Sequence, residues 1–180
     1  MSDIRKIYLV VLVTCVFAAP AWSLDPRTFV LDMLKALSPD GYYIVDTYTN
    51  EAYKPTDFME YFDSTSEYTI MASFDTIVHE ISHGYMAMEQ SHSTYFFVSR
   101  DESIRVPHTA VFRTSEIAGE FPDELRTFRF CYVDTDSPNL GAQVEGVYGL
   151  LDEMNAYYLG CKTSYDLYLY YLEEGPEANW

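Results

Sequence analysis

The chain has 180 residues and a formal net charge of −17, with 28 acidic side chains against 11 basic ones. A surface this acidic repels nucleic acid and anionic lipid, so the composition argues against a function in binding either. This length is enough for one domain with a substantial hydrophobic core and too short for two independent domains.

Residues 1 to 23 have the pattern of a secretory signal peptide. Arg5 and Lys6 form a short basic region, residues 7 to 17 form an apolar region, and Ala21-Trp22-Ser23 is a cleavage site of the small-x-small type. The apolar run is shorter than the roughly 20 residues that a membrane-spanning helix needs, and no later stretch of the sequence approaches that length.

We therefore expect cleavage near Ser23/Leu24 and a mature protein that is secreted or periplasmic, without stable insertion in the membrane. Leu12-Val13-Thr14-Cys15 offers a lipoprotein signal as an alternative, although Thr14 fits poorly before the cysteine. The mature chain, residues 24 to 180, is predicted to form a single domain.

The first part of the mature chain predicts one helix and one strand. Apolar residues recur at helical spacing from Pro26 to Leu37, and Ser38-Pro39-Asp40-Gly41 ends the pattern with residues typical of turns. Residues 42 to 48 are rich in residues that favour strands and predict a strand, which is followed by a loop containing Pro55.

A long amphipathic helix is predicted from about residue 66 to residue 90. Ser64 and Glu67 have the spacing of a capping box, and apolar side chains then recur at helical intervals along one face. Gly84 lies between the apolar and polar faces of this helix, where the missing side chain would let another segment pass close. A helical glycine without that role is the alternative.

The same helix carries the pattern His-Glu-x-x-His at residues 79 to 83. Since an α-helix advances 100° per residue, His79 and His83 lie one turn apart on one face and Glu80 lies beside them. Two neutral imidazoles can bind Zn²⁺ and leave an open position for a water, from which a neighbouring carboxylate takes a proton. We predict His79 and His83 as zinc ligands and Glu80 as the general base; the alternative is a chance grouping on one helix face.

Four β-prone segments follow and predict a small antiparallel sheet. They span residues 94 to 99, 103 to 106, 109 to 117 and 127 to 133. Residues 121 to 126 predict a helical turn instead. His92 and His108 lie near loops in this region, and we interpret both as surface histidines rather than ligands.

The mature chain contains two cysteines, Cys131 and Cys161. An even number in an exported protein predicts one disulfide, which would stabilise the fold by roughly 3–4 kcal/mol because it closes a loop of about 30 residues. The spacing is not that of a zinc site, and two buried free thiols are the alternative.

A second long helix is predicted from about Gln143 to Gly160, and it should complete the metal site because catalytic zinc normally takes three protein ligands. The candidate third ligands are Glu145, Asp152 and Glu153. On a helical wheel Glu153 lies in a seam of small residues that would let two helices approach closely: Gly146, Gly149, Ala156 and Gly160. Glu145 and Asp152 lie off the seam and are interpreted as solvated charges. Glu153 is therefore the favoured ligand, and Glu145 is the next.

The pairing of His-Glu-x-x-His with the later segment Asp152-Glu153-Met154-Asn155-Ala156-Tyr157 resembles the zincin metallopeptidases of the glutamate-ligand branch. The resemblance covers two helices. It implies an α+β, zincin-like fold in which the active-site helix packs on a second, ligand-bearing helix and a small antiparallel sheet. It also implies an oxyanion-stabilising histidine or tyrosine, for which Tyr157 is the best candidate.

The metzincin branch fits poorly, because Met86 and Glu89 stand where that branch requires a glycine and a third histidine. We expect an exported zinc-dependent metallopeptidase that hydrolyses a peptide or protein substrate with a zinc-bound water activated by Glu80. Two alternatives stay open: a zinc amide hydrolase acting on cell-wall peptides, and a non-catalytic zinc-binding or structural exported protein. The sequence indicates no oligomeric state.

Overall fold

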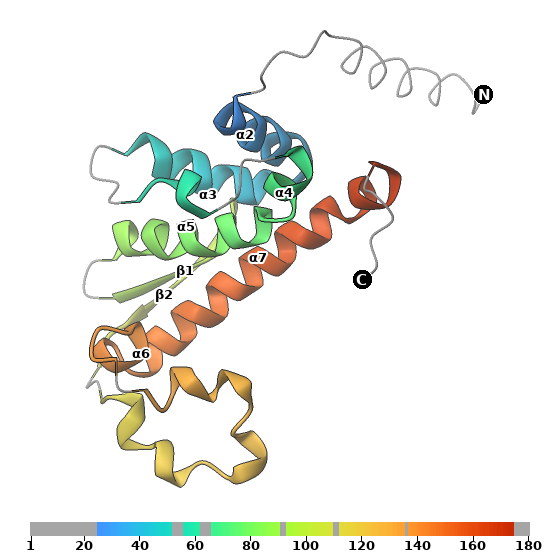
Figure 1. The fold of residues 1–180 in the computed structure, drawn as a ribbon. Helices are drawn as coiled ribbons and strands as arrows, with labels where there is room; N and C mark the ends of the chain where they lie inside the picture. Colours follow the sequence, from blue (N-terminus) through green and yellow to red (C-terminus); the bar gives the residue numbers. More distant parts are fainter. Residues whose placement is uncertain are drawn as a thin grey trace, which may run out of the picture.

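The computed structural model describes residues 25–51, 56–61, 66–90, 93–109, 112–135 and 137–174. Helices pack against one two-stranded antiparallel sheet (Figure 1), which confirms the predicted α+β class. The predicted signal peptide lies outside the described residues. No helix in the described ranges is long and apolar enough to cross a lipid bilayer.

The first two helices are α2 (Pro26–Leu37), which was predicted, and α3 (Pro39–Asn50), which was not. Asp25 caps α2 by accepting a hydrogen bond from the Thr28 backbone N–H at 3.2 Å. The strand predicted for residues 42 to 48 is wrong, because Pro39 starts a helix whose residues Ile44, Val45 and Tyr48 are buried at helical spacing. Burial of this face outweighs the preference of Tyr, Ile and Val for strands.

The helix predicted for residues 66 to 90 is two helices, α4 (Glu67–Met71) and α5 (Phe74–Glu89), separated by a turn at Ala72 and Ser73. Ser66 begins α4, since its side chain accepts from the Thr69 backbone N–H at 3.2 Å. Ser64, the predicted start of the capping box, lies outside the described residues. The buried face of α5 carries five apolar residues that the sequence pattern predicted: Phe74, Ile77, Val78, Ile81 and Tyr85. Met88, also predicted on this face, is 39% exposed, and Met86 is buried instead.

The sheet contains β1 (Ser93–Ser99) and β2 (Glu102–Pro107), which pair antiparallel with Phe96 opposite Ile104. Two of the four predicted strands are therefore confirmed. The segments predicted as strands at 109 to 117 and 127 to 133 contain short 3₁₀ helices instead. These and their neighbours are η2 (Thr114–Glu116), η3 (Ala118–Glu120), η4 (Asp123–Leu125) and η5 (Phe128–Tyr132), of which η4 is the helical turn predicted within residues 121 to 126.

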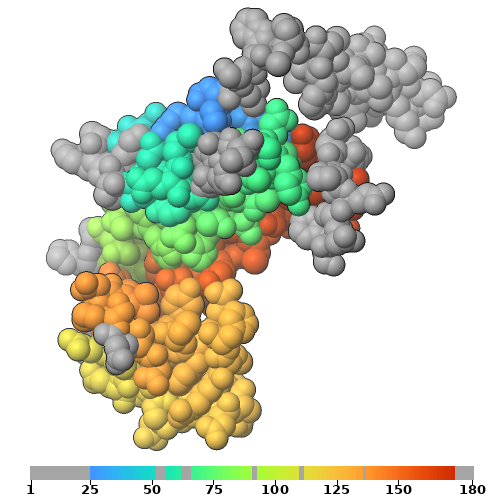
Figure 2. All heavy atoms as spheres, viewed as in Figure 1, coloured from blue at the N-terminus to red at the C-terminus, as the bar shows by residue number. Residues whose placement is uncertain are grey.

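We call described residues 112–135 and 137–140 the turn lobe, which extends from one end of the molecule in Figures 1 and 2. Its apolar side chains do not alternate between a buried and an exposed face: Phe128 is 82% exposed and Leu125 is 57% exposed. β-propensity without a partner strand or a buried face is insufficient to form a sheet, which explains why the strand predictions fail here.

The predicted helix at 143 to 160 begins later and runs further than expected. A short helix, α6 (Gly141–Val144), ends before Gly146, whose backbone has a φ of 60° that favours glycine. The chain then turns into α7 (Val147–Glu174), which has 28 residues and lies along α5.

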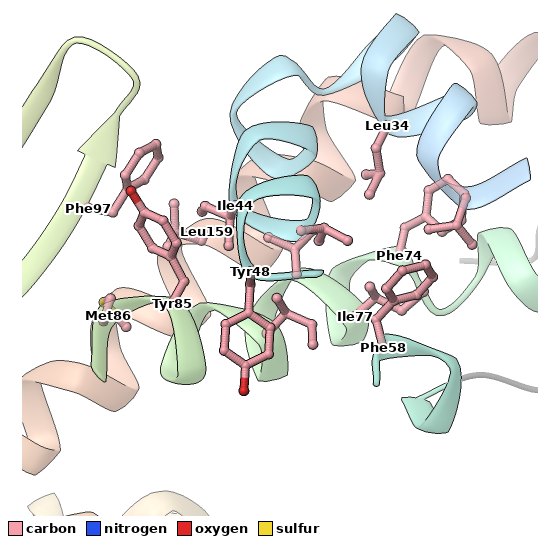
Figure 3. Packing of buried hydrophobic residues seen from close by; sticks show 14 of the residues in the cluster. Leu34, Ile44, Tyr48, Phe58, Phe74, Ile77, Tyr85, Met86, Phe97 and Leu159 are labelled. Carbon is pink, nitrogen blue, oxygen red and sulfur yellow. The ribbon is translucent and has the colours of Figure 1, made fainter. Parts of the chain in front are cut away.

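The hydrophobic core lies between α3, α5, α7 and β1 (Figure 3). The Phe97 ring of β1 packs edge-on against the Tyr85 ring of α5, with centroids 5.7 Å apart. Polar contacts fix α7 against this core. The side-chain oxygen of Asn155 accepts a hydrogen bond from the Phe97 N–H at 3.1 Å, and its side-chain nitrogen donates to the Phe97 carbonyl at 2.9 Å. The Ser38 hydroxyl donates to the Asp166 carboxylate at 2.8 Å.

Three glycines mark places where elements approach closely: Gly84, Gly149 and Gly160. A Cβ on Gly84 would lie 2.5 Å from the Tyr48 ring, so α3 does pass close to α5 at this point. A Cβ on Gly160 would lie 2.9 Å from the Asp75 carbonyl oxygen and 3.5 Å from the His79 Cβ. The predicted seam of α7 is therefore confirmed at Gly160, whereas Gly149 packs against the backbone of α6.

The Gly160→Ala variant should be less stable than the parent protein by about 1–3 kcal/mol, because the added methyl group meets the backbone of α5 rather than a flexible side chain. Urea unfolding of the metal-free protein measures this difference. Gly119→Ala is the matched control, since a Cβ at that position would have no described atom within 4 Å. Equal unfolding free energies for the two variants would contradict the close packing of α5 and α7.

Candidate metal centre

Helices α5 and α7 bring three predicted ligands together. The Nε2 atoms of His79 and His83 lie 3.3 Å apart, and Oε2 of Glu153 lies 3.8 Å from each of them. Among the described residues, these are the His, Cys, Asp and Glu side chains grouped closely enough to hold one metal ion. The structure thus brings together the three residues that were predicted as ligands.

The triangle formed by these atoms has the size that zinc requires. A point equidistant from its three corners lies about 2.1 Å from each, which is the usual length of a Zn–N or Zn–O bond. Glu153 Oε2 is buried and has no hydrogen-bond partner among the described residues. A buried carboxylate oxygen without a donor is costly, and a cation between the three atoms would compensate it.

Asp152 contacts the ring nitrogen of His83 that faces away from the ligand triangle. Its Oδ2 lies 2.5 Å from Nδ1 of His83, which leaves Nε2 of the same ring directed at His79 and Glu153. Carboxylates bonded to the outer nitrogen of a metal-binding histidine fix its tautomer and orientation. The interpretation of Asp152 as a solvated charge is therefore wrong. The sequence carries no local signal for this contact, because the two residues lie 69 positions apart on different helices.

Glu80 lies at the open side of the cluster. Its side chain is 40% exposed, and Oε1 lies 4.0 Å from Nε2 of His79. It lines a pocket of about 180 Å³ between α5 and α7, together with Asp75, Thr76, His79, Tyr157, Gly160 and Cys161. A carboxylate so placed can reach a water in the pocket without itself completing the ligand triangle.

Burial and charge shift the pKa values of the cluster in different directions. Burial, followed by the neighbouring charge of His83, lowers the pKa of His79. Burial also acts to lower the pKa of His83, but the hydrogen bond and charge of Asp152, with the charges of Glu153 and Glu80, outweigh it and raise that pKa. The pKa of Glu153 is raised, chiefly by burial. The metal-free cluster therefore tends to retain a proton.

Three residues beside the cluster form a second group of contacts. The Tyr157 ring lies edge-on to the His79 ring, with centroids 4.4 Å apart. The Tyr157 hydroxyl accepts a hydrogen bond from Arg129 and lies 3.0 Å from the Tyr132 hydroxyl. The hydrogen bond between the Tyr132 and Tyr157 hydroxyls, followed by burial and the Glu153 charge, raises the pKa of Tyr132 to about 12. Tyr157 was a predicted candidate, whereas no local pattern singles out Arg129 and Tyr132.

The remaining candidates lie elsewhere. Glu145 terminates α6 and does not belong to the cluster. His108 lies 2.5 Å from the Thr94 hydroxyl and stacks on the Tyr148 ring with centroids 4.6 Å apart, so its contacts are structural. His92 lies outside the described residues.

The structure differs from the disulfide prediction. Cys131 of η5 and Cys161 of α7 are free cysteines, and both are exposed. The disulfide was predicted from an even number of cysteines behind an export signal, but pairing also needs Cβ atoms about 4 Å apart. Here η5 belongs to the turn lobe rather than to the predicted sheet, so the segment carrying Cys131 is placed differently from the prediction.

No protein-family model, curated protein sequence or solved structure matches the chain. The resemblance to zincins stays a prediction from two helices, and the function proposed below rests on the geometry and chemistry of the cluster.

Asp152→Asn should weaken zinc binding about 10- to 100-fold at pH 8, because the amide holds the His83 ring less firmly and does not increase its basicity. Competition with a chromogenic chelator measures the affinity. Glu145→Gln is the matched control, since it removes one charge from the neighbouring turn without touching the cluster. A similar loss in both variants would indicate a general effect of charge and would contradict the positioning role.

Zinc affinity should fall as the pH decreases through the raised pKa of His83, because zinc binds only the deprotonated imidazole. The expected slope below that pKa is about tenfold per pH unit for one displaced proton, with a plateau above it. Chelator competition between pH 5 and 9 gives the profile. In Asp152→Asn the inflection should move to lower pH because the acidic partner is lost; an unchanged inflection would contradict the assignment.

Proposed function

We propose that the protein is an exported zinc-dependent metallopeptidase with a zincin-like site, in which His79, His83 and Glu153 are the metal ligands. The observation that carries the proposal is the ligand triangle, in which a buried Glu153 oxygen at one corner has no hydrogen-bond partner among the described residues. The packing of α5 on α7 and on β1 supports a zincin-like arrangement.

A zinc ion, when bound, supplies a Lewis acid that polarises the scissile carbonyl and makes water more acidic. The chain's own residues supply the rest. Glu80, partly exposed beside the pocket, accepts a proton from the attacking water and returns it to the leaving amine. Asp152 keeps the His83 ring in the tautomer whose Nε2 lone pair faces the ligand position.

Tyr157 is placed for a further role at the same pocket. Its ring contacts His79, and its hydroxyl lies in a hydrogen-bonded group with Tyr132 and Arg129. Donors of this kind stabilise the negative charge that develops on a carbonyl oxygen during hydrolysis. The pocket between α5 and α7 is open to solvent on the side of Glu80, so a peptide segment can approach it there.

Glu80→Gln should abolish hydrolysis while zinc content stays close to one ion per chain, because glutamine keeps the size of glutamate and lacks its basicity. Glu153→Gln should lose zinc and activity together, since a neutral amide is a poor zinc ligand. Elemental analysis of reconstituted protein and a screen of fluorogenic peptides provide the two readouts.

The contrast between the two variants is decisive. Full zinc content in Glu153→Gln would remove Glu153 from the ligand set, and wild-type turnover in Glu80→Gln would refute the enzymatic proposal. Zinc binding without hydrolysis of any peptide would favour a non-catalytic zinc protein, while cleavage confined to cell-wall peptides would favour the narrower amide hydrolase.

A further inference from the structure

Arg129 of the turn lobe lies over the wall of the candidate active site. Its guanidinium carbon is 4.2 Å from the centroid of the Tyr157 ring and 4.7 Å from that of Phe128, and Nη1 donates to the Tyr157 hydroxyl. The Tyr157 ring in turn contacts His79 and lines the pocket. One aromatic ring therefore separates this cation from a predicted zinc ligand.

No carboxylate forms an ion pair with Arg129 among the residues that the structure describes. Arg126 of the same lobe differs in this respect, because its Nε lies 3.6 Å from Asp123. Arg129 is also exposed, in a chain whose net charge is −17. An exposed cation beside a pocket, held by aromatic rings rather than by an acid, keeps its hydrogen-bonding edges available for a ligand.

A planar guanidinium is the side chain best suited to bind a carboxylate through two parallel hydrogen bonds. We propose that Arg129 is a specificity-determining residue that binds a carboxylate of the substrate next to the scissile bond. The inference rests on the proposed peptidase function and names its substrate class: peptides that carry a free carboxylate at this subsite.

The charges around the pocket make this subsite selective. Glu80, Asp152 and Glu153 place three carboxyl groups at or near the pocket, and a bound zinc ion would offset two negative charges, so a further cation favours the approach of an anionic substrate group. Arg129 is thus the group that lets an acidic substrate approach an acidic site.

The carboxylate can come from the C-terminus of a peptide or from an acidic side chain. Three ligands separate these sources: N-acetyl-Phe-Phe, its C-terminal amide, and N-acetyl-Phe-Glu with a C-terminal amide. The zinc-loaded Glu80→Gln protein should be used so that binding is measured without hydrolysis. Isothermal titration at low and moderate salt gives the affinities.

At least one of the two carboxylate ligands should bind about 10- to 100-fold more tightly than the neutral amide, which is the range for a charged hydrogen-bonded pair. Adding Arg129→Gln should remove this preference, which is measured within that variant as the ratio of its affinities for the carboxylate ligand and the neutral amide. Arg129→Lys should restore only part of it, because an ammonium lacks the planar pair of donors.

Arg113→Gln is the matched control, since Arg113 is an exposed arginine of the same lobe and lines a different pocket. It should leave the preference intact. The inference is overturned if neither carboxylate ligand binds more tightly than the amide, or if the preference survives in Arg129→Gln. Zinc content and peptide turnover, which test the proposed function, are measured separately, so either idea can fail alone.

Discussion

The close approach of α5 and α7 at Gly160 is the constraint on which the candidate site depends. The histidines are on one helix and the glutamate is on the other, and a glutamate side chain is too short to bridge helices held apart by larger residues. The missing side chain at position 160 lets the helix backbone lie against the Asp75 carbonyl and the His79 Cβ. With this contact in place, the distances within the ligand triangle follow from ordinary helix geometry.

The electrostatics of the cluster follow from this packing. Two carboxylates and two imidazoles share a half-buried space, and two of the carboxylate oxygens, one each from Asp152 and Glu153, have no hydrogen-bond partner among the described residues. A buried carboxylate without such partners is unfavourable in a folded protein unless a cation or a proton balances its charge. The pKa values of His83 and Glu153 are both raised, which favours a bound proton in the metal-free cluster. The size of the ligand triangle is compatible with a metal ion in place of that proton.

The sequence predicts the parts of this site that repeat within one helix. His79 and His83 are four residues apart, so their shared face follows from the helical period alone, and Glu153 was found because glycines on its own helix marked a close contact. Asp152, Arg129 and Tyr132 were missed because their roles depend on contacts between distant segments. No local pattern encodes such contacts.

The secondary-structure predictions also fail where contacts between distant segments decide the conformation. Residues 42 to 48 favour a strand by composition, but their apolar side chains are buried at helical spacing against α5. In the turn lobe, residues 127 to 133 have strand-forming composition without a partner to pair with. Both errors arise where tertiary contacts decide between conformations that local propensity leaves nearly equal in energy.

Asp152, Glu153 and Asn155 lie within four consecutive positions of α7 and contact three different partners: the outer face of His83, the ligand position and the backbone of β1. Inserting or deleting one residue between Asn155 and Gly160 would turn all three side chains through about 100° relative to Gly160. The site is therefore tied to the number of residues in α7 between Asp152 and Gly160. A substitution at another position of this stretch leaves the register of the helix unchanged, whereas a change in length separates Asp152 and Glu153 from the Gly160 contact.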